Sequence, residues 1–234
     1  MWFGESGRLI GALSGGLLDI LYPPRCAGCE GVMRASEQPL CARCVASLER
    51  VDQAELDGAL DTDTHQEIAS NFALWMFDKG GILQRAQHLL KYGRRPGFGR
   101  SLGHVLGRAW QSERSVVPEL IVPVPLHPAR LYERGYNQSA MLAAGVAEAI
   151  RVPLLLDGVR RTAATRRQTG LSREERSANV QGAFAIETAS VEGRRVLLID
   201  DVVTTGATSL AAARALLAAR AVCVDFAALA FARH

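Results

Sequence analysis

Short apolar runs alternate with longer helix-like patterns along most of this chain. The apolar runs cover residues 72–77, 120–125, 152–156, 196–199 and 221–231. Residues 82–92, 138–150 and 209–219 have the spacing or the alanine- and leucine-rich composition of helices. This alternation predicts an α/β domain with a mostly parallel sheet flanked by helices. The last run is continuously apolar, as expected for a strand buried on both faces of such a sheet.

The apolar segment near the amino terminus, residues 9–21, has a different character. Arg8 and Asp19 bracket a stretch that is too short to span a bilayer. Its spacing predicts an amphipathic helix that docks on the protein's own core or on a partner subunit. With no recognisable targeting signal, we expect a cytoplasmic protein with no membrane span.

Composition places the chain among ordinary globular proteins. It has 234 residues, of which 48% are hydrophobic and 22% charged, and its formal net charge is +3. So weak a positive balance does not by itself indicate a nucleic-acid partner. We expect a helix and a cysteine-rich segment in residues 1–50, an acidic linker or irregular cover in 51–70, and the α/β domain in 71–234.

The run at 196–199 leads into the most informative stretch of the sequence. Asp200 and Asp201 follow it directly, and a small, hydroxyl-rich turn at residues 204–208 precedes the next helix. Such a turn lets the backbone approach an anion at a helix amino terminus, whereas the two carboxylates suit hydroxyl groups or a divalent cation. The pattern therefore predicts a sugar phosphate bound with Mg²⁺. The alternative is an ordinary strand-to-helix turn with loop-capping aspartates.

Neither of two better-known phosphate motifs is present. No Gly-x-x-x-x-Gly-Lys-Ser/Thr loop occurs, and no Gly-x-Gly-x-x-Gly follows a predicted strand. This disfavours nucleoside-triphosphate and dinucleotide folds.

Two Cys-x-x-Cys pairs predict a metal site. Cys26 and Cys29 form the first pair, and Cys41 and Cys44 the second. Four thiolates at this spacing can surround one Zn²⁺ ion, and a site with four protein ligands is structural rather than catalytic. Two disulfides are the alternative. The fifth cysteine, Cys223, lies in an apolar run and is interpreted as an inert buried thiol.

Arginines are concentrated between residues 157 and 179, among polar residues with little apolar periodicity. A long polar loop of this kind predicts a lid or a binding loop, and arginine side chains suit phosphate oxygens. Basic residues also gather among glycines at 91–100, where we expect a loop that is either solvated or functional. His127, beside prolines, is either a general acid or base or a residue that only hydrogen-bonds its loop.

Residues 198–208, Leu-Ile-Asp-Asp-Val-Val-Thr-Thr-Gly-Ala-Thr, resemble the 5-phosphoribosyl-1-pyrophosphate (PRPP) signature of type I phosphoribosyltransferases. The paired cysteines and the segments 75–92, 122–127, 134–138 and 168–184 are, in that order, similar to the ComF family. These are amidophosphoribosyltransferase-like proteins associated with competence for DNA uptake. The resemblance covers nearly all of the chain after Leu18, and it implies a type I phosphoribosyltransferase-like fold with a small amino-terminal zinc-ribbon-like element.

The resemblance also implies roles for individual residues. Asp200 and Asp201 would hold the ribose hydroxyls with Mg²⁺ nearby, and both are catalytic candidates together with Arg134. The 5-phosphate would bind Thr204, Thr205, Gly206, Ala207 and Thr208. The pyrophosphate loop would contribute Pro125, Leu126, His127 and Arg130. The arginine-rich loop would close over the site with Arg161, Gln168, Arg173 and Arg176.

The implied reaction is transfer of the phosphoribosyl group of PRPP to an unidentified acceptor, with release of pyrophosphate through an oxocarbenium-like transition state. The alternative is a non-catalytic accessory protein of DNA uptake that binds PRPP, single-stranded DNA or a competence-machinery protein. Thr204 stands where purine-salvage members carry an aspartate base, so we do not expect a purine acceptor. Many relatives carry a further cysteine pair that residues 51–70 lack, so we expect one zinc ion.

Overall fold

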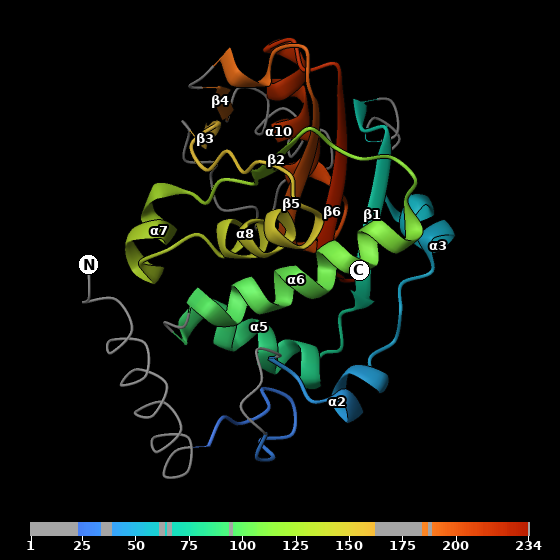
Figure 1. Cartoon of the computed structure of the whole chain (residues 1–234), viewed down its shortest axis with the longest axis vertical. Helices are drawn as coiled ribbons and strands as arrows, with labels where there is room; N and C mark the ends of the chain where they lie inside the picture. The colour runs from blue at the N-terminus through green and yellow to red at the C-terminus, as the bar shows by residue number, and fades with distance from the viewer. Residues whose placement is uncertain are drawn as a thin grey trace, which may run out of the picture.

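A computed structural model describes residues 23–33, 39–60, 64, 67–93, 96–161, 184–186 and 189–233. The expected amino-terminal helix lies outside these residues, as do residues 162–179 of the arginine-rich segment. Four parallel strands form the central sheet in the order β1-β6-β5-β2 (Figure 1). Their bounds are β1 Ser70–Met76, β2 Leu120–Pro123, β5 Arg195–Val203 and β6 Cys223–Phe231. The predicted α/β class with a parallel sheet is confirmed.

Both faces of the sheet are covered. Side chains of β5 alternate between two cores, because successive residues of a strand point to opposite faces. Leu197 and Ile199 pack with residues of α6 (Pro96–Glu113) and α8 (Gln138–Ile150). Val196 and Leu198 pack with residues of α3 (Gln53–Ala59) and α10 (Ala207–Ala218). All four side chains are fully buried, as the continuous apolar run at 196–199 implies.

The sequence-based interpretation of residues 91–100 as a loop is wrong for residues 96–100, which begin helix α6. Its glycines allow a close crossing with α8, because a Cβ on Gly103 would lie 2.1 Å from the carbonyl oxygen of Leu142. A Cβ on Gly145 of α8 would in turn lie 1.9 Å from the carbonyl oxygen of Arg100. Arg100 itself pairs with Glu148 across the same contact. Gly103 and Gly145 are therefore packing residues at the crossing of the two helices.

The expected linker also contains ordered structure. Within residues 51–70, the Asp52 side chain accepts a hydrogen bond from Ala54 N–H at 3.0 Å and caps α3. Leu56 of this helix is 0% exposed and packs in the core that contains α10. This part of the segment is thus a helical cover of the sheet, while the domain boundaries themselves stay a prediction.

The remaining elements lie around this core. Helix α5 (Ile82–Tyr92) and helix α8 occur where the sequence predicts helices. The predicted strand at 152–156 is reduced to a single parallel bridge between Leu154 and Ile121, next to Pro153, which has no N–H group to donate. The other elements are α2 (Ala42–Ala46), α7 (Pro128–Arg134), η1 (Ala189–Val191) and an antiparallel pair of β3 (Val159–Arg161) and β4 (Phe184–Ile186).

No helix in the described part of the chain has both the length and the apolar character needed to cross a membrane.

Candidate functional site

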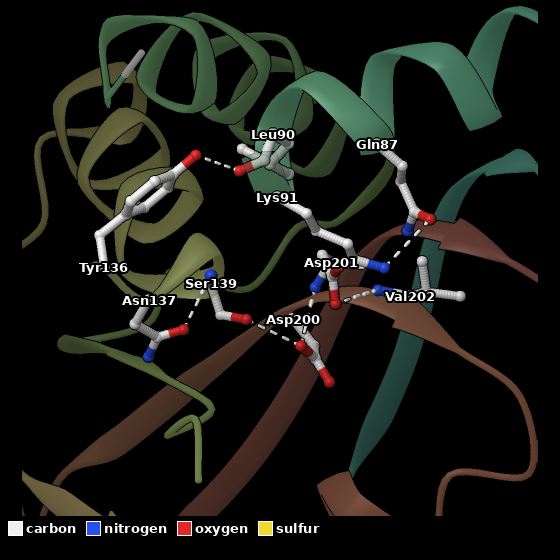
Figure 2. A network of polar contacts seen from close by, with 9 residues as sticks. All are labelled: Gln87, Leu90, Lys91, Tyr136, Asn137, Ser139, Asp200, Asp201 and Val202. Atoms are coloured by element: carbon white, nitrogen blue, oxygen red, sulfur yellow. Dashed lines mark hydrogen bonds and ion pairs between the residues drawn. The ribbon is translucent and has the colours of Figure 1, made fainter. Parts of the chain in front are cut away.

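Asp200 and Asp201 lie near the carboxyl end of β5, an interior strand of the sheet. The strand continues to Val203, so the two acids lie within it rather than after it. Asp200 Oδ1 accepts hydrogen bonds from Ser139 Oγ and from Asp201 N–H, both at 2.8 Å (Figure 2). Asp201 Oδ1 accepts one from Val202 N–H at 3.0 Å. These contacts fix both carboxylates at the edge where the strands end.

Lys91 of α5 forms an ion pair with the second of these two acids. Its Nζ lies 3.3 Å from Asp201 Oδ2 and 3.3 Å from Gln87 Oε1 (Figure 2). The lysine and aspartate side chains are 25% and 17% exposed, so the ion pair is partly shielded from water. Neither Lys91 nor Ser139 was expected at the site. For Lys91 the sequence contains one signal: lysine is rare in this chain, and Lys79 and Lys91 are the only two.

The environment changes the acidity of Asp200. Burial raises the pKa of its carboxyl group and the neighbouring Asp201 carboxylate raises it further, to about 8, although hydrogen bonds from Ser139 and Asp201 oppose this. The free protein therefore holds a proton at this acidic pair near neutral pH. Two adjacent carboxyl groups with so perturbed a titration are typical of a site that receives a cation or hydroxyl donors.

The turn after β5 opens the amino terminus of α10. Gly206 has a φ of +80°, and a Cβ there would lie 3.0 Å from Leu60 Cδ2 and 3.2 Å from Thr64 Oγ1. As the N-cap residue, Gly206 offers no side chain to the first turn of this twelve-residue helix. The N–H groups of that turn are consequently suited to an external anion. Thr204 is exposed, while Thr205, Ala207 and Thr208 are half-buried.

The segment after β2 runs alongside the end of β5. Val124 N–H donates to the Ile199 carbonyl at 2.8 Å. Asn137 Nδ2 donates to the Val124 carbonyl at 3.0 Å, and Asn137 Oδ1 accepts from Ser139 N–H at 3.1 Å, which makes it the predicted N-cap of α8. Pro125 and Leu126 are half-buried in this segment.

His127 follows in the same segment and has a local role. Its Nδ1 accepts a hydrogen bond from Ala129 N–H at 3.2 Å and caps α7. This contact is the loop hydrogen bond that was one of the two interpretations of His127. Arg130, one turn further on, is exposed.

Two further expected site residues, Arg134 and Arg161, have different surroundings. The Arg134 guanidinium lies 5.7 Å from the centroid of the Tyr92 ring, and its Nε has no hydrogen-bond partner in the described part of the chain. Burial and the charge of Arg130 lower the pKa of Arg161, whereas the charge of Asp200 raises it. Arg161 is therefore within electrostatic range of both. Three expected site residues lie outside the described residues: Gln168, Arg173 and Arg176.

The four cysteines of the two pairs form a separate cluster. Their sulfur atoms all lie within 4.8 Å of one another, and the Sγ atoms of Cys29 and Cys41 are 3.8 Å apart. A tetrahedron with Zn–S bonds of about 2.3 Å has edges of about 3.8 Å, so the cluster fits a zinc ion. All cysteines of the chain are free thiols, and the structure does not contain the alternative pair of disulfides.

The protonation of this cluster also fits a metal ion. Burial raises the pKa of Cys26, but backbone N–H groups of Cys29, Cys41 and Gly28 outweigh it and hold the value at about 6. Burial, and hydrogen bonds that the Cys44 thiol donates to the other cysteines, raise the pKa of Cys44 to about 12. A cation is therefore needed to hold all four sulfurs as thiolates.

Two family models match the chain. The double zinc ribbon domain matches residues 17–55, and the phosphoribosyl transferase domain matches residues 137–234. Competence protein F of Haemophilus influenzae is 29% identical over 195 residues, which are 82% of this chain and 84% of that protein. The DNA utilization protein YhgH of Escherichia coli K12 is 36% identical over 134 residues, 56% of this chain and 59% of that protein.

The chain thus contains a phosphoribosyl transferase domain and a double zinc ribbon, and it is similar to proteins named competence protein F, DNA utilization protein YhgH and competence protein ComFC. These sequence matches confirm the resemblance drawn from the motifs. A solved structure of the allosteric regulatory enzyme of purine biosynthesis aligns with 60% of the chain at 26% identity and a TM-score of 0.41. The chain spans 29% of that enzyme and 59% of YhgH. The phosphoribosyl transferase match includes the two aspartates and α10, whereas Lys91 lies outside both matched segments.

Proposed function

We propose that this protein binds PRPP with Mg²⁺ at the carboxyl edge of its sheet and transfers the phosphoribosyl group to an acceptor that is not a purine. One observation carries the proposal. The Asp200–Asp201 pair is followed within one turn by Gly206 and the uncapped amino terminus of α10. Hydroxyl acceptors and a phosphate cradle thus lie next to each other, within the segment that matches a phosphoribosyl transferase domain.

Each part of PRPP has a complementary group in this arrangement. The backbone N–H groups and hydroxyls of residues 204–208 would bind the 5-phosphate at the positive end of the α10 dipole. Asp200 and Asp201 would accept hydrogen bonds from the 2- and 3-hydroxyls of the ribose. The pKa of Asp200, raised to about 8, supports this, because hydroxyl donors and a nearby cation would stabilise the ionised form.

The pyrophosphate would occupy the segment after β2. Pro125, Leu126 and His127 would border it, and Arg130 and Arg134 of α7 would supply positive charge together with Arg161 of β3. When bound, Mg²⁺ would neutralise pyrophosphate charge and so improve it as a leaving group. In the proposal, Gln168, Arg173 and Arg176 complete this cationic surface.

In the proposed transfer, the bond between the anomeric carbon and the pyrophosphate oxygen breaks, and pyrophosphate leaves with the electron pair. The nucleophile of the acceptor then bonds to the same carbon. The arginines favour this step by stabilising charge that develops on the leaving group. Thr204 is exposed at the position where a purine-specific enzyme would need a base, and its hydroxyl does not ionise at neutral pH.

Helix α7 supports a second candidate, a non-catalytic accessory protein that binds single-stranded DNA. None of its residues is buried, and Tyr132 is 93% exposed between Arg130 and Arg134. An exposed aromatic ring flanked by arginines is able to stack on a base beside the phosphate backbone. The names of the relatives, competence protein and DNA utilization protein, agree with this role.

A single zinc ion and a cytoplasmic location belong to the same proposal. The chain has five cysteines, and the one outside the cluster, Cys223, lies in β6. Only one four-cysteine site can therefore form.

Calorimetry with Mg²⁺ and PRPP tests the proposal. We expect wild type to bind and the Asp200→Asn/Asp201→Asn variant to bind at least about a hundredfold more weakly, since each charge-assisted hydrogen bond contributes roughly 1.5–3 kcal/mol. Asp157→Asn, a change at an exposed turn, is the matched control. No binding by wild type would refute the proposal.

If PRPP binds, pyrophosphate release with candidate acceptors separates an enzyme from a binding protein. Anisotropy with a labelled single-stranded oligonucleotide tests the second candidate, for which Tyr132→Ala should weaken binding several-fold.

A further inference from the structure

Helix α5 connects the cysteine cluster to the acidic pair. At its amino end, Arg85 Nε donates to the Gly28 carbonyl at 2.9 Å. Gly28 lies between two cysteines of the cluster and packs so closely on Ile82 that a Cβ would lie 2.8 Å from Ile82 Cγ2. At its carboxyl end, the same helix carries Lys91 to Asp201. Figure 1 shows the cysteine-bearing segment next to α5. The amino end of the helix is thus attached to the cysteine-bearing segment, and its carboxyl end contributes a side chain to the site.

The contacts around Lys91 hold its ammonium group in place. Gln87, one helical turn earlier, accepts from Lys91 Nζ, and Tyr136 OH donates to the Leu90 carbonyl next to it (Figure 2). Gln87 is only 5% exposed, and its Nε2 has no partner in the described part of the chain. A buried amide donor is therefore present beside the ammonium group, at the end of β5. Lys79, the other lysine of the chain, is exposed and has no comparable contacts described.

The acidic pair needs a fixed positive charge. Two adjacent carboxylates repel each other when both are ionised, and burial increases that cost. Ser139 and backbone N–H groups supply hydrogen bonds, but they supply no net charge. Lys91 is the cation that forms a described ion pair with Asp201.

We propose that Lys91 is a positioning residue of this site, which pairs with Asp201 so that, when PRPP binds, both carboxylates are ionised and oriented for its ribose hydroxyls. The inference rests on the proposed function and adds α5 to the site. In this role Lys91 acts through Asp201 and makes no contact of its own with the reacting atoms. Its effect is on the affinity for the ribose part of the ligand.

Binding of Mg²⁺ and PRPP to single variants tests the inference. Lys91→Met should weaken binding about tenfold or more, because the repulsion between the two carboxylates is then no longer offset. Lys91→Arg keeps a cation near Asp201 and should restore affinity to within about threefold of wild type. Lys79→Met removes the same charge from an exposed position and should leave affinity unchanged.

Thermal melting and zinc content of each variant separate positioning from folding. We expect Lys91→Met to melt within a few degrees of wild type and to retain its zinc. If it does not fold, Lys91→Gln replaces it in the comparison, since glutamine keeps a donor without the charge. A lower affinity that Lys91→Arg does not restore would overturn the inference.

The two proposals fail in different ways. Absence of PRPP binding by wild type would overturn both. Binding by wild type that Lys91→Met leaves unchanged would overturn the role of Lys91 alone.

Discussion

Replacement of Asp200 by asparagine should stabilise the protein while it removes the proposed function. The acid is half-buried next to Asp201, and its partial removal from water and the charge of Asp201 together raise its pKa to about 8 from a usual value of 3.8. Asparagine has nearly the same shape as the protonated acid and can accept the hydrogen bond from Ser139 Oγ. It therefore removes the cost of ionising this position, at the expense of the charge that the ribose hydroxyls need.

The sign of the pH dependence follows from the direction of this shift. Below about pH 4 the acid is protonated in the folded and the unfolded chain, so it contributes no difference. Between about pH 4 and 8 the folded chain keeps a proton that the unfolded chain has lost, and the free energy of unfolding falls as pH rises. Above about pH 8 the acid is ionised in both states, and this group no longer changes the free energy of unfolding with pH.

The size of the effect can be bounded. One pKa unit corresponds to about 1.4 kcal/mol, so a shift of four units gives an upper bound of roughly 6 kcal/mol. Asp200 keeps some contact with solvent, and part of the shift is shared with Asp201. We therefore expect the advantage of Asp200→Asn to grow by about 2 kcal/mol between pH 5 and pH 8.

Urea denaturation of wild type, Asp200→Asn and Asp157→Asn at half-unit steps from pH 5 to pH 8.5 measures this difference. At each pH, the free energy of unfolding of wild type is subtracted from that of each variant, which cancels the contribution of all other titrating groups. The reasoning is refuted if the advantage of Asp200→Asn is independent of pH, or if the variant is the less stable protein at pH 8.

Three further predictions concern the ligand, the helix crossing and the metal. If PRPP needs ionised Asp200, its affinity should rise with pH and gain about fivefold between pH 7 and pH 8, and a pH-independent dissociation constant would contradict this. Gly103→Ala should lower the free energy of unfolding by about 2–4 kcal/mol, because the new Cβ would meet the backbone of α8. Gly58 has open space around it, so Gly58→Ala should not lower the free energy of unfolding. Equal melting temperatures of the two variants would contradict the packing argument. Metal analysis should give about one zinc per chain for wild type and less for Cys26→Ser, and a metal-free, oxidised but folded wild type would exclude the site.

Local patterns were sufficient for several elements. Helices α5 and α8 begin and end where the sequence predicts them, and Asn137 caps α8 as its residue type suggests. Capping and helical periodicity depend on residues within a few positions of each other, so they can be recognised without the fold. The same holds for the cysteine cluster, whose pairs are each separated by two residues.

Helix α6 and the length of β5 depend on distant partners. Glycines argue for a loop when only neighbours in sequence are considered. In the structure, Gly99 instead lies within α6 and packs against α8 so closely that a Cβ would lie 2.7 Å from Met141 Cβ. Likewise, β5 continues through Asp200 because β6 pairs with it as far as Val203.

The sequence by itself determined the order of acids, turn and helix at residues 200–208, because these residues are consecutive and their types indicate the ligand chemistry. Only the tertiary structure decided the electrostatics of that unit. Ser139 comes from α8 and Lys91 from α5, and the burial that raises the pKa of Asp200 comes from the packing around the sheet. Charge state depends on what surrounds a group in space, and those surroundings are assembled from segments that are far apart in the chain.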